Sequence, residues 1–285
     1  MGRWRLLIVT LMVIFSSAAT TGAAQSRRVV SLGPFITEDL YLLGAQEQLA
    51  GVTKYCIRPP QAQEKEIVGT VVEFSTEKVL ALMPDVVLAT PLSDRRGVDV
   101  LRAAGISVVE LPQPKDFDQI CRQVEQLGML VGRGAAAAEI VIAAQQRVAA
   151  AERMIAGRVR PKVFIQIGSN PLFTTNRDYF IHDLVARAGG DNIAAAADSG
   201  IYSREKVIAD NPDCIVIATM GLAAEEESRQ WRQYPSIAAV KHKRIFVMDS
   251  YLVCSPTPVS FAESLEQMIR FLHPEAAEMN TTGAF

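Results

Sequence analysis

The sequence has few of the residues from which most metal centres and disulfide scaffolds are built. Only 3 of its 285 residues are histidine and 4 are cysteine. This scarcity argues against a histidine-rich metal site and rules out a disulfide-dense scaffold. The cysteines form no Cys-x-x-Cys pair, so the usual zinc-ribbon and thioredoxin spacings are absent. Cys121 and Cys214 lie in apolar stretches and are interpreted as buried free thiols.

The sequence also lacks a large excess of either positive or negative charge. The 29 basic and 31 acidic residues give a formal net charge of −2, which argues against nucleic acid as the main partner. With 49% apolar and 21% charged residues, the chain is neither disordered nor collagenous. Its length corresponds to roughly one to three domains at ~100–200 residues each.

No apolar run near the N-terminus is long enough to cross a membrane. Leu6 to Phe15 is a ten-residue run, too short for ~30 Å of hydrocarbon. Two arginines precede it, and the small-residue tract SSAATTGAA follows it to Ala24. This layout predicts a cleavable signal peptide over residues 1–24 and an exported protein; an uncleaved anchor is the alternative. No cysteine precedes Cys56, so a lipoprotein is not expected.

Short apolar runs alternate with amphipathic helices after residue 28, which predicts an α/β fold with mainly parallel sheets. The predicted strands are Val29–Leu32, Leu49–Thr53, Val86–Ala89, Ser107–Leu111, Val163–Ile167, Cys214–Ala218 and Ile245–Met248. The predicted helices are Thr37–Leu43, Thr76–Met83, Val98–Ala104, Ile181–Ala188 and Phe261–Leu272.

An alanine-rich stretch divides the chain. Arg133 to Ile155 lacks proline and has no glycine after Gly134, which predicts a helix ~33 Å long. A coiled-coil partner helix is the alternative, but the required heptad is not sustained. The pattern predicts two Rossmann-like lobes, residues 25–132 and 158–285, joined by one rigid helix at 133–157. Such a strut predicts that the lobes close by only a small angle.

One internal repeat links the two lobes. Residues 74–89 (FSTEKVLALMPDVVLA) and 202–217 (YSREKVIADNPDCIVI) match without a gap at 7 of 16 positions, at a constant offset of 128. Ser75 and Ser203 are predicted N-caps, and Glu77 and Glu205 follow in the first turn. The two glutamates are either good helix-start residues or a pair of docking points for a symmetric partner.

The chain resembles the periplasmic solute-binding proteins of ABC importers that have a single connecting helix and take up cobalamin, ferric siderophores or haem. The resemblance covers residues 28–273, and within this group the vitamin B12-binding proteins are the most similar. The stretches that carry it are VTKY followed by PPQA at 52–62, TEKVLALMPDVVLA at 76–89, VFIQIGSNPLFTT at 163–175, GGDNI at 189–193, and Ser203-Arg204-Glu205.

The resemblance implies that Glu77 and Glu205 dock on arginines of a permease dimer that carries ATPase subunits. It implies a monomeric receptor, a small-molecule ligand and no resident cofactor or metal. The ligand is expected in a cleft between the lobes, where loops leave the carboxyl ends of the strands. The candidate wall residues are Pro34, Phe35, Tyr55 and Cys56 in the first lobe and Asn170, Phe173, Tyr202 and Tyr251 in the second.

Departures from the vitamin B12 type leave the ligand open. Val71 occupies the place of a tryptophan that packs on the ligand, and Tyr202 is the only aromatic residue near the place of the second. A ferric siderophore is the first alternative, since Lys54, Arg58, Arg95 and Arg177 are available. Haem is another, with Tyr55 or Tyr251 as the ligand. Soft-metal ligation by Cys56 and Cys254 is conceivable.

An exported hydrolase is the alternative from a different class of protein. Ser169, Asp178 and His182 lie close in the sequence. The Gly-x-Ser-x-Gly nucleophile motif is absent, and His182 is interpreted as a helix-surface residue. The chain is therefore expected to be a binding protein and not an enzyme.

Overall fold

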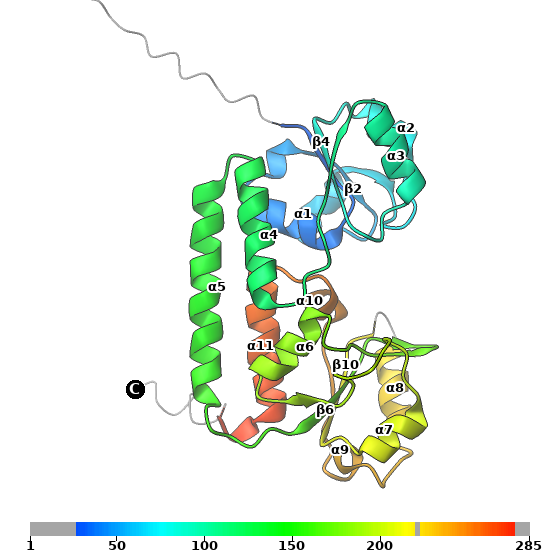
Figure 1. Ribbon diagram of the computed structural model, residues 1–285, viewed down its shortest axis with the longest axis vertical. Helices are drawn as coiled ribbons and strands as arrows, with labels where there is room; N and C mark the ends of the chain where they lie inside the picture. Colours follow the sequence, from blue (N-terminus) through cyan, green and yellow to red (C-terminus); the bar gives the residue numbers. More distant parts are fainter. Residues whose placement is uncertain (1–26, 220–222, 277–285) are drawn as a thin grey trace, which may run out of the picture.

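The computed structural model describes residues 27–219 and 223–276 (Figure 1). The predicted signal peptide at 1–24 lies outside these residues. The described chain forms two α/β lobes arranged along the long axis of the molecule, with long helices along one side. The predicted fold class is therefore confirmed. No helix in the described ranges is both long and apolar enough to span a membrane.

The N-terminal lobe contains a five-stranded parallel sheet in the order β3-β2-β1-β4-β5. Its strands are β1 (Val29–Ser31), β2 (Leu49–Thr53), β3 (Glu66–Gly69), β4 (Val86–Ala89) and β5 (Ser107–Glu110). Its helices are α1 (Pro34–Leu42), α2 (Thr76–Ala81) and α3 (Arg95–Ala103), with 3-10 turns at Gln46–Gln48 and Pro60–Glu64.

The C-terminal lobe contains a four-stranded parallel sheet in the order β11-β10-β6-β9. Its strands are β6 (Lys162–Gln166), β9 (Asp191–Asn192), β10 (Cys214–Ile217) and β11 (Ile245–Val247), and a small antiparallel hairpin joins β7 (Gly168–Ser169) to β8 (Leu172–Phe173). Its helices are α6 (Phe180–Arg187), α7 (Arg204–Asp210), α8 (Ala223–Trp231), α9 (Ala238–Lys241), α10 (Ser250–Cys254) and α11 (Pro258–Leu272).

Each sheet is covered by helices on both faces. Successive residues of a strand point to opposite faces. In β1, Val29 therefore packs with α1 and α4, while Val30 packs with α2 and α3. In β6, Val163 packs with α5, α6 and α11, while Phe164 packs with α7 and α8. These continuously apolar short strands are typical of parallel sheets buried on both faces.

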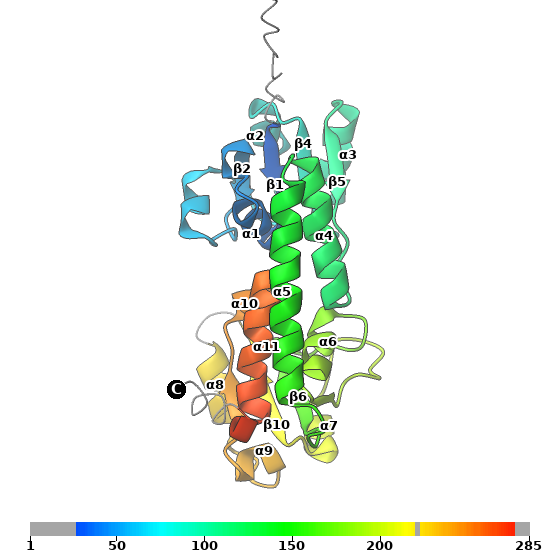
Figure 2. The ribbon, with the colours of Figure 1, turned by 90° about the vertical axis from the view of Figure 1, so that its left-hand side faces the viewer.

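Two helices, not one, span the boundary between the lobes. Helix α5 (Gly134–Met154) is the predicted strut, and α4 (Phe117–Leu130) runs antiparallel beside it (Figure 2). The first half of α4 packs in the C-terminal core through Phe117, Ile120 and Cys121, and its second half packs in the N-terminal core. The predicted lobe boundary at residue 132 therefore differs from the structure, because part of α4 belongs to the second lobe. Helix α5 links the lobes as predicted, and α4 packs beside it and contributes to both cores.

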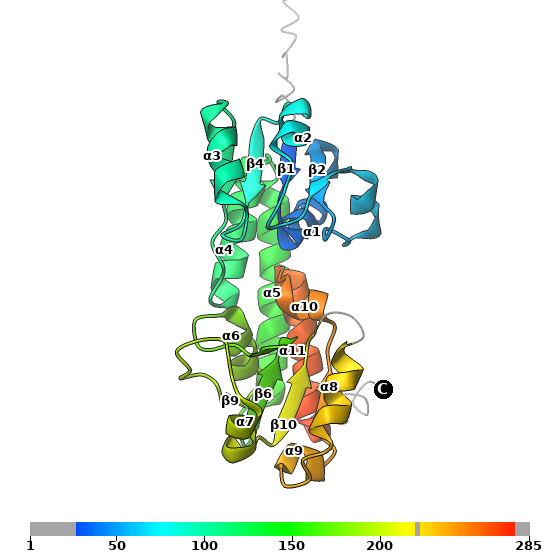
Figure 3. The same cartoon turned by 90° about the vertical axis from the view of Figure 1, so that its right-hand side faces the viewer.

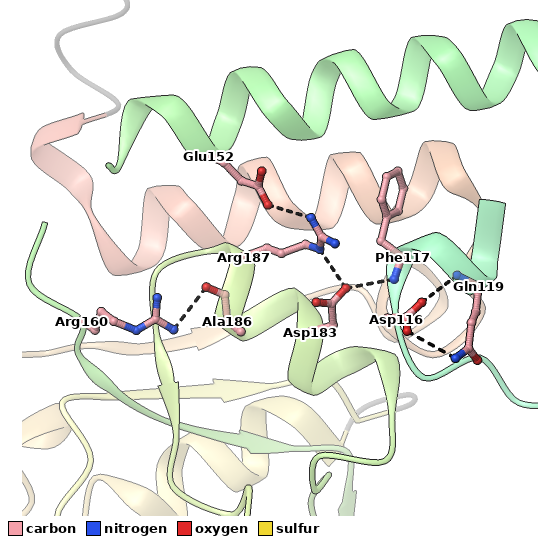
Figure 4. Close-up of polar contacts among 8 residues, drawn as sticks. All are labelled: Asp116, Phe117, Gln119, Glu152, Arg160, Asp183, Ala186 and Arg187. Atoms are coloured by element: carbon pink, nitrogen blue, oxygen red, sulfur yellow. Dashed lines mark hydrogen bonds and ion pairs between the residues drawn. The ribbon is translucent and has the colours of Figure 1, made fainter. Parts of the chain in front are cut away.

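A polar network fastens α4 and α5 to α6 (Figure 4). The backbone N–H of Phe117 donates to the Asp183 carboxylate at 2.9 Å, and the Arg187 guanidinium donates to the same carboxylate at 2.8 Å. Arg187 also donates to Glu152 of α5 at 2.8 Å and lies over the Phe117 ring. Asp183 of α6 thus satisfies the free amide at the start of α4, and Arg187 of the same helix extends the network to α5.

We expect Asp183→Ala to lower the free energy of unfolding by about 2–3 kcal/mol, since two hydrogen bonds are lost, one of them to a charged partner. The control is Asp178→Ala, whose carboxylate lies 3.6 Å from Lys115 with both side chains mostly exposed. An exposed pair of this kind contributes about 0–1 kcal/mol. Urea denaturation of both variants measures the difference, and equal losses would contradict a specific role for Asp183.

One carboxyl group in the N-terminal lobe is buried without a partner. Asp39 of α1 is 1% exposed, and among the described residues its Oδ1 has no hydrogen-bond partner. Burial raises the pKa of Asp39 well above its usual value, and the neighbouring Glu38 adds to the rise. The unfolded chain releases the Asp39 proton at the lower, usual pKa, so the stability that the protonated carboxyl contributes is lost as the pH rises from that value through the raised folded pKa.

Asp39→Asn is accordingly expected to stabilise the protein at pH 7–8, by about 1–3 kcal/mol, because an amide has no proton to lose on unfolding. The gain should shrink toward pH 4, where the unfolded carboxyl is also protonated. Denaturation curves across this range compare the variant with wild type and with Glu139→Gln, a change on the exposed face of α5. A pH-independent difference would show that the raised pKa is not the cause.

Candidate ligand-binding site

A cavity of ≈ 230 Å³ lies where the two lobes meet. In the N-terminal sheet, β2 and β3 extend from one side of β1, and β4 and β5 extend from its other side. The chain order thus reverses between β1 and β4, and ligands of open α/β sheets bind at such a point, outside the carboxyl ends of the strands. The cavity lies there: Pro34 and Phe35 follow β1, and Thr90 and Leu92 follow β4.

Residues of both lobes line the cavity. The N-terminal lobe contributes Pro34, Phe35, Tyr55, Val71, Thr90, Leu92 and Gln113, and the C-terminal lobe contributes Ser250, Tyr251, Cys254 and Ser255. The latter four come from α10 and the residue after it, a short helix that ends close to α1 and the lower end of α4 (Figure 1). The wall is mainly apolar and aromatic, and no charged residue is among its described lining.

The floor of the cavity requires a glycine. A Cβ on Gly33, the residue before α1, would lie 2.7 Å from Cγ2 of Thr90, which is too close for any side chain. Gly33 therefore lets the start of α1 approach the end of β4. This brings Phe35 and Thr90 into the same wall.

Four of the eight predicted wall residues line the cavity: Pro34, Phe35, Tyr55 and Tyr251. The interpretation of Cys56 and Tyr202 is corrected. Cys56 is 0% exposed, its thiol shares a hydrogen bond with the Thr53 hydroxyl at 3.1 Å, and burial raises its pKa. Tyr202 packs on Phe164 in the C-terminal core, and its hydroxyl donates to Asp210 at 2.6 Å. Both side chains face the protein interior.

Asn170 and Phe173 do not line this cavity either. Both are exposed on the β7–β8 hairpin of the C-terminal lobe. The backbone of this hairpin pairs with residues 200–202, since Thr174 N–H donates to Gly200 O and Tyr202 N–H donates to Leu172 O. Their contact with a ligand stays a prediction.

Charged groups gather near the boundary between the lobes. Glu38 of α1 lies 3.4 Å from Arg58. Burial raises the pKa of Glu38, the nearby Arg58 lowers it, and the negative charges of Glu263 and Asp249 in the C-terminal lobe raise it further. Carboxylates of the two lobes thus face one another, with Arg58 as the positive charge beside Glu38.

The thiols do not form a metal site in the described ranges. No group of three or more potential metal ligands occurs there. Cys121 and Cys214 are free and buried, as predicted, and burial raises the pKa of each to about 12. Cys254 is exposed at the cavity, and desolvation raises its pKa to about 11.

The hydrolase arrangement is not assembled. Asp178 pairs with Lys115, and the buried Nδ1 of His182 has no hydrogen-bond partner among the described residues. His182 is half-buried on α6. No described hydrogen bond connects Ser169 to either residue, so the chain lacks the nucleophile–base contact that this chemistry requires.

Glu77 and Glu205 occupy equivalent places. Each follows a serine N-cap, since Ser75 accepts from Lys78 N–H and Ser203 from Lys206 N–H. Both glutamates are exposed, and α2 and α7 lie on the side of the molecule away from α5 (Figures 1 and 3). The pKa of Glu205 is held below its usual value by its own backbone N–H and by Ser203. The N-caps are thus confirmed, and docking stays a prediction.

Comparison with known proteins identifies the family to which the chain belongs. Residues 29–252 match the family model described as periplasmic binding protein, and the chain belongs to this family. It is a substrate-binding protein of the ABC importer type and not an enzyme.

Two curated relatives and two solved structures are similar to the chain. An uncharacterised ABC transporter substrate-binding lipoprotein of Bacillus subtilis is 28% identical, over 91% of this chain and 84% of the relative. A vitamin B12-binding protein of Salmonella choleraesuis is 32% identical, over 67% and 72%. The periplasmic vitamin B12 binding protein of Vibrio cholerae has a TM-score of 0.77 at 25% identity, over 88% and 98%. A periplasmic haem binding protein of Pseudomonas aeruginosa shares the fold, with a TM-score of 0.79 at 24% identity over 87% and 93%.

Proposed function

We propose that this protein binds a corrinoid, cobalamin or a related compound, and delivers it to an ABC permease dimer with its ATPase subunits. The observation that carries this proposal is the inter-lobe cavity, whose described lining is apolar and aromatic and carries no charged residue. Such a wall suits a large ligand with apolar edges better than a ferric siderophore of high negative charge, which needs cationic partners.

The cavity is smaller than a whole corrinoid, so the ligand would insert one edge and leave the rest between the lobes. Tyr55 and Phe35 on one side and Tyr251 on the other supply flat surfaces with few rotors to immobilise. The relatives named vitamin B12-binding proteins support this ligand class. Val71 lines the cavity, so the site lacks a tryptophan there and is wider at that point.

The ligand is cargo, and we propose no resident cofactor or metal. The receptor acts as a monomer in the periplasm, released by cleavage near Ala24. The Bacillus relative is named a lipoprotein, whereas the first cysteine in this sequence is Cys56, which is buried inside the N-terminal lobe.

Titration of the purified protein against a panel of ligands tests the proposal. The panel holds cyanocobalamin, dicyanocobinamide, haemin, and ferric complexes of a hydroxamate and a catecholate siderophore. We expect saturable 1:1 binding of a corrinoid, which changes in the absorption spectrum of the ligand would measure. Denaturation of the complex should release the ligand unchanged. Binding of haemin or of a ferric siderophore without any corrinoid would overturn the corrinoid assignment. Chemical conversion of the ligand would overturn the receptor role.

A further inference from the structure

The structure extends the internal repeat beyond the matching sequence. Helices α3 and α8 begin at residues 95 and 223 and end at residues 103 and 231, so both ends differ by the same 128 positions as Ser75 and Ser203. The unit α2-β4-α3 of the first lobe therefore corresponds to α7-β10-α8 of the second, residue by residue. This correspondence allows the surroundings of Glu77 and Glu205 to be compared directly.

A buried polar cluster lies beside Glu205, and we name it the Arg204 anchor; it consists of Gln166, Arg204, Glu227 and Trp231. Gln166 ends β6 and is 0% exposed. Its amide donates to Glu227 at 2.8 Å and its carbonyl accepts from the Trp231 indole at 2.7 Å. Arg204 donates to the same Glu227 carboxylate and to Gln230, and its guanidinium lies 4.7 Å over the Trp231 ring.

The corresponding positions of the N-terminal lobe hold no such cluster. Thr76 stands where α7 has Arg204, Asp99 where α8 has Glu227, and Ala103 where α8 has Trp231. Asp99 is exposed and pairs only with Arg102, at 3.7 Å within its own helix. Helix α2 is instead fastened from its surface, because Lys78 donates to Glu66 at 2.9 Å and to the Ile67 carbonyl at 3.0 Å.

The anchor holds the start of α7, whereas the end of the helix is held by Asp210, which accepts from the Tyr202 hydroxyl at 2.6 Å. The helix has seven residues, and Val207 is its only buried side chain. A helix of this length has little stability of its own, so tertiary contacts set its position. Arg204 is the first residue of α7 and Glu205 the second, so the contacts that fix Arg204 also fix the backbone from which the Glu205 side chain projects.

We propose that Arg204 and Glu227 are positioning residues for Glu205, and that they hold the docking point of the C-terminal lobe in one orientation against the permease. This inference rests on the proposed role of Glu205 in docking. It also implies that the two docking points are not equivalent, because only the second is held by an ion pair between the partly buried Arg204 and the buried Glu227, with the guanidinium over an aromatic ring.

Association of the ligand-loaded protein with its permease–ATPase complex in liposomes tests the inference. One variant is Arg204→Thr, which introduces the residue that the first lobe has at the corresponding position, Thr76. The other is Glu227→Gln, which keeps the shape of the anchor and removes the negative charge that pairs with Arg204. Asp99→Asn is the matched control at the corresponding position of α3. Each is made in the wild-type and in the Glu205→Gln background, with ligand affinity and thermal unfolding measured in parallel.

We expect Arg204→Thr and Glu227→Gln to weaken association roughly fivefold to tenfold, with little further loss once Glu205 is already Gln. Asp99→Asn should leave association unchanged, and ligand affinity should stay within about twofold in all variants. If Arg204→Thr fails to fold, Arg204→Lys replaces it, since it keeps the charge and loses the planar stacking.

Equal losses in both backgrounds would overturn the inference, because the anchor would then act independently of Glu205. If the Arg204 and Glu227 variants associate with the permease as tightly as the wild-type protein while Glu205→Gln does not, the positioning role alone is refuted. Wild-type association of Glu205→Gln itself would refute the docking role on which the inference rests.

Discussion

Uptake is expected to be lost when Glu77 and Glu205 are both replaced by lysine, while the affinity for the ligand stays nearly unchanged. Neither side chain lines the inter-lobe cavity, and both project from exposed first turns on the open side of the two lobes. Two separated charges fix the orientation of a receptor on a two-subunit permease, and reversing them places like charges together. Each single change to glutamine should lower the transport rate, and the double change should lower it on the order of tenfold or more.

Glu125→Lys with Glu139→Lys is the matched control for this experiment. It changes the net charge by the same amount, on exposed positions of the α4–α5 hairpin. The control should transport at the wild-type rate, and thermal unfolding should show that both double variants remain folded. Wild-type transport by the Glu77→Lys, Glu205→Lys protein would leave the two glutamates as helix-start residues only.

Removing the aromatic groups that face each other across the cavity should have the second large effect. Tyr55→Ala and Tyr251→Ala are each expected to weaken ligand binding roughly tenfold or more, because each deletes a large contact surface from one lobe. Both tyrosine side chains are partly exposed in the free protein, so replacing either by alanine leaves no empty space in a hydrophobic core. The double variant should bind more weakly than either single variant. Equilibrium titration with the corrinoid that the ligand panel selects gives the dissociation constants.

Tyr179→Ala is the control for these variants. Tyr179 is as exposed as Tyr55, at 43% and 41%, but it precedes α6 and lies outside the cavity lining. Its loss should leave the dissociation constant unchanged. An equal effect of all three changes, or no effect of Tyr55→Ala, would remove the cavity from the binding site.

The sequence was sufficient to predict the two-lobe α/β fold, because continuous apolar strands and amphipathic helices are local patterns. Strand Val86–Ala89 and strand Leu49–Thr53 are confirmed without any change in their bounds. Helix α1 begins three residues earlier than predicted, since Pro34 is well suited to the first turn of a helix. The double role of α4 was not predictable, because no local pattern tells which core each half of an amphipathic helix enters.

The site was predicted only in part, for a geometric reason. Neighbouring residues of an extended segment point in opposite directions. Ile201 is therefore 56% exposed while Tyr202 is 7% exposed. In the turn after β2, Tyr55 is 41% exposed while Cys56 is fully buried. The sequence locates the loop but not which neighbour faces the cavity. Thr90 and Leu92 could have been found, since they directly follow a buried strand, whereas five-residue α10 gives no periodic signal.

The division of α4 between two cores has a consequence for how the chain folds. Phe117, Ile120 and Cys121 complete the hydrophobic core of the C-terminal lobe, although they precede α5 in the chain. The C-terminal lobe therefore cannot finish folding from the segment after α5 alone, and the N-terminal lobe needs the second half of the same helix. A break before α4 would leave the N-terminal lobe without part of its core, and a break after α4 would do the same to the C-terminal lobe. The two lobes should therefore unfold as one cooperative unit, unlike independent domains that are joined by a linker.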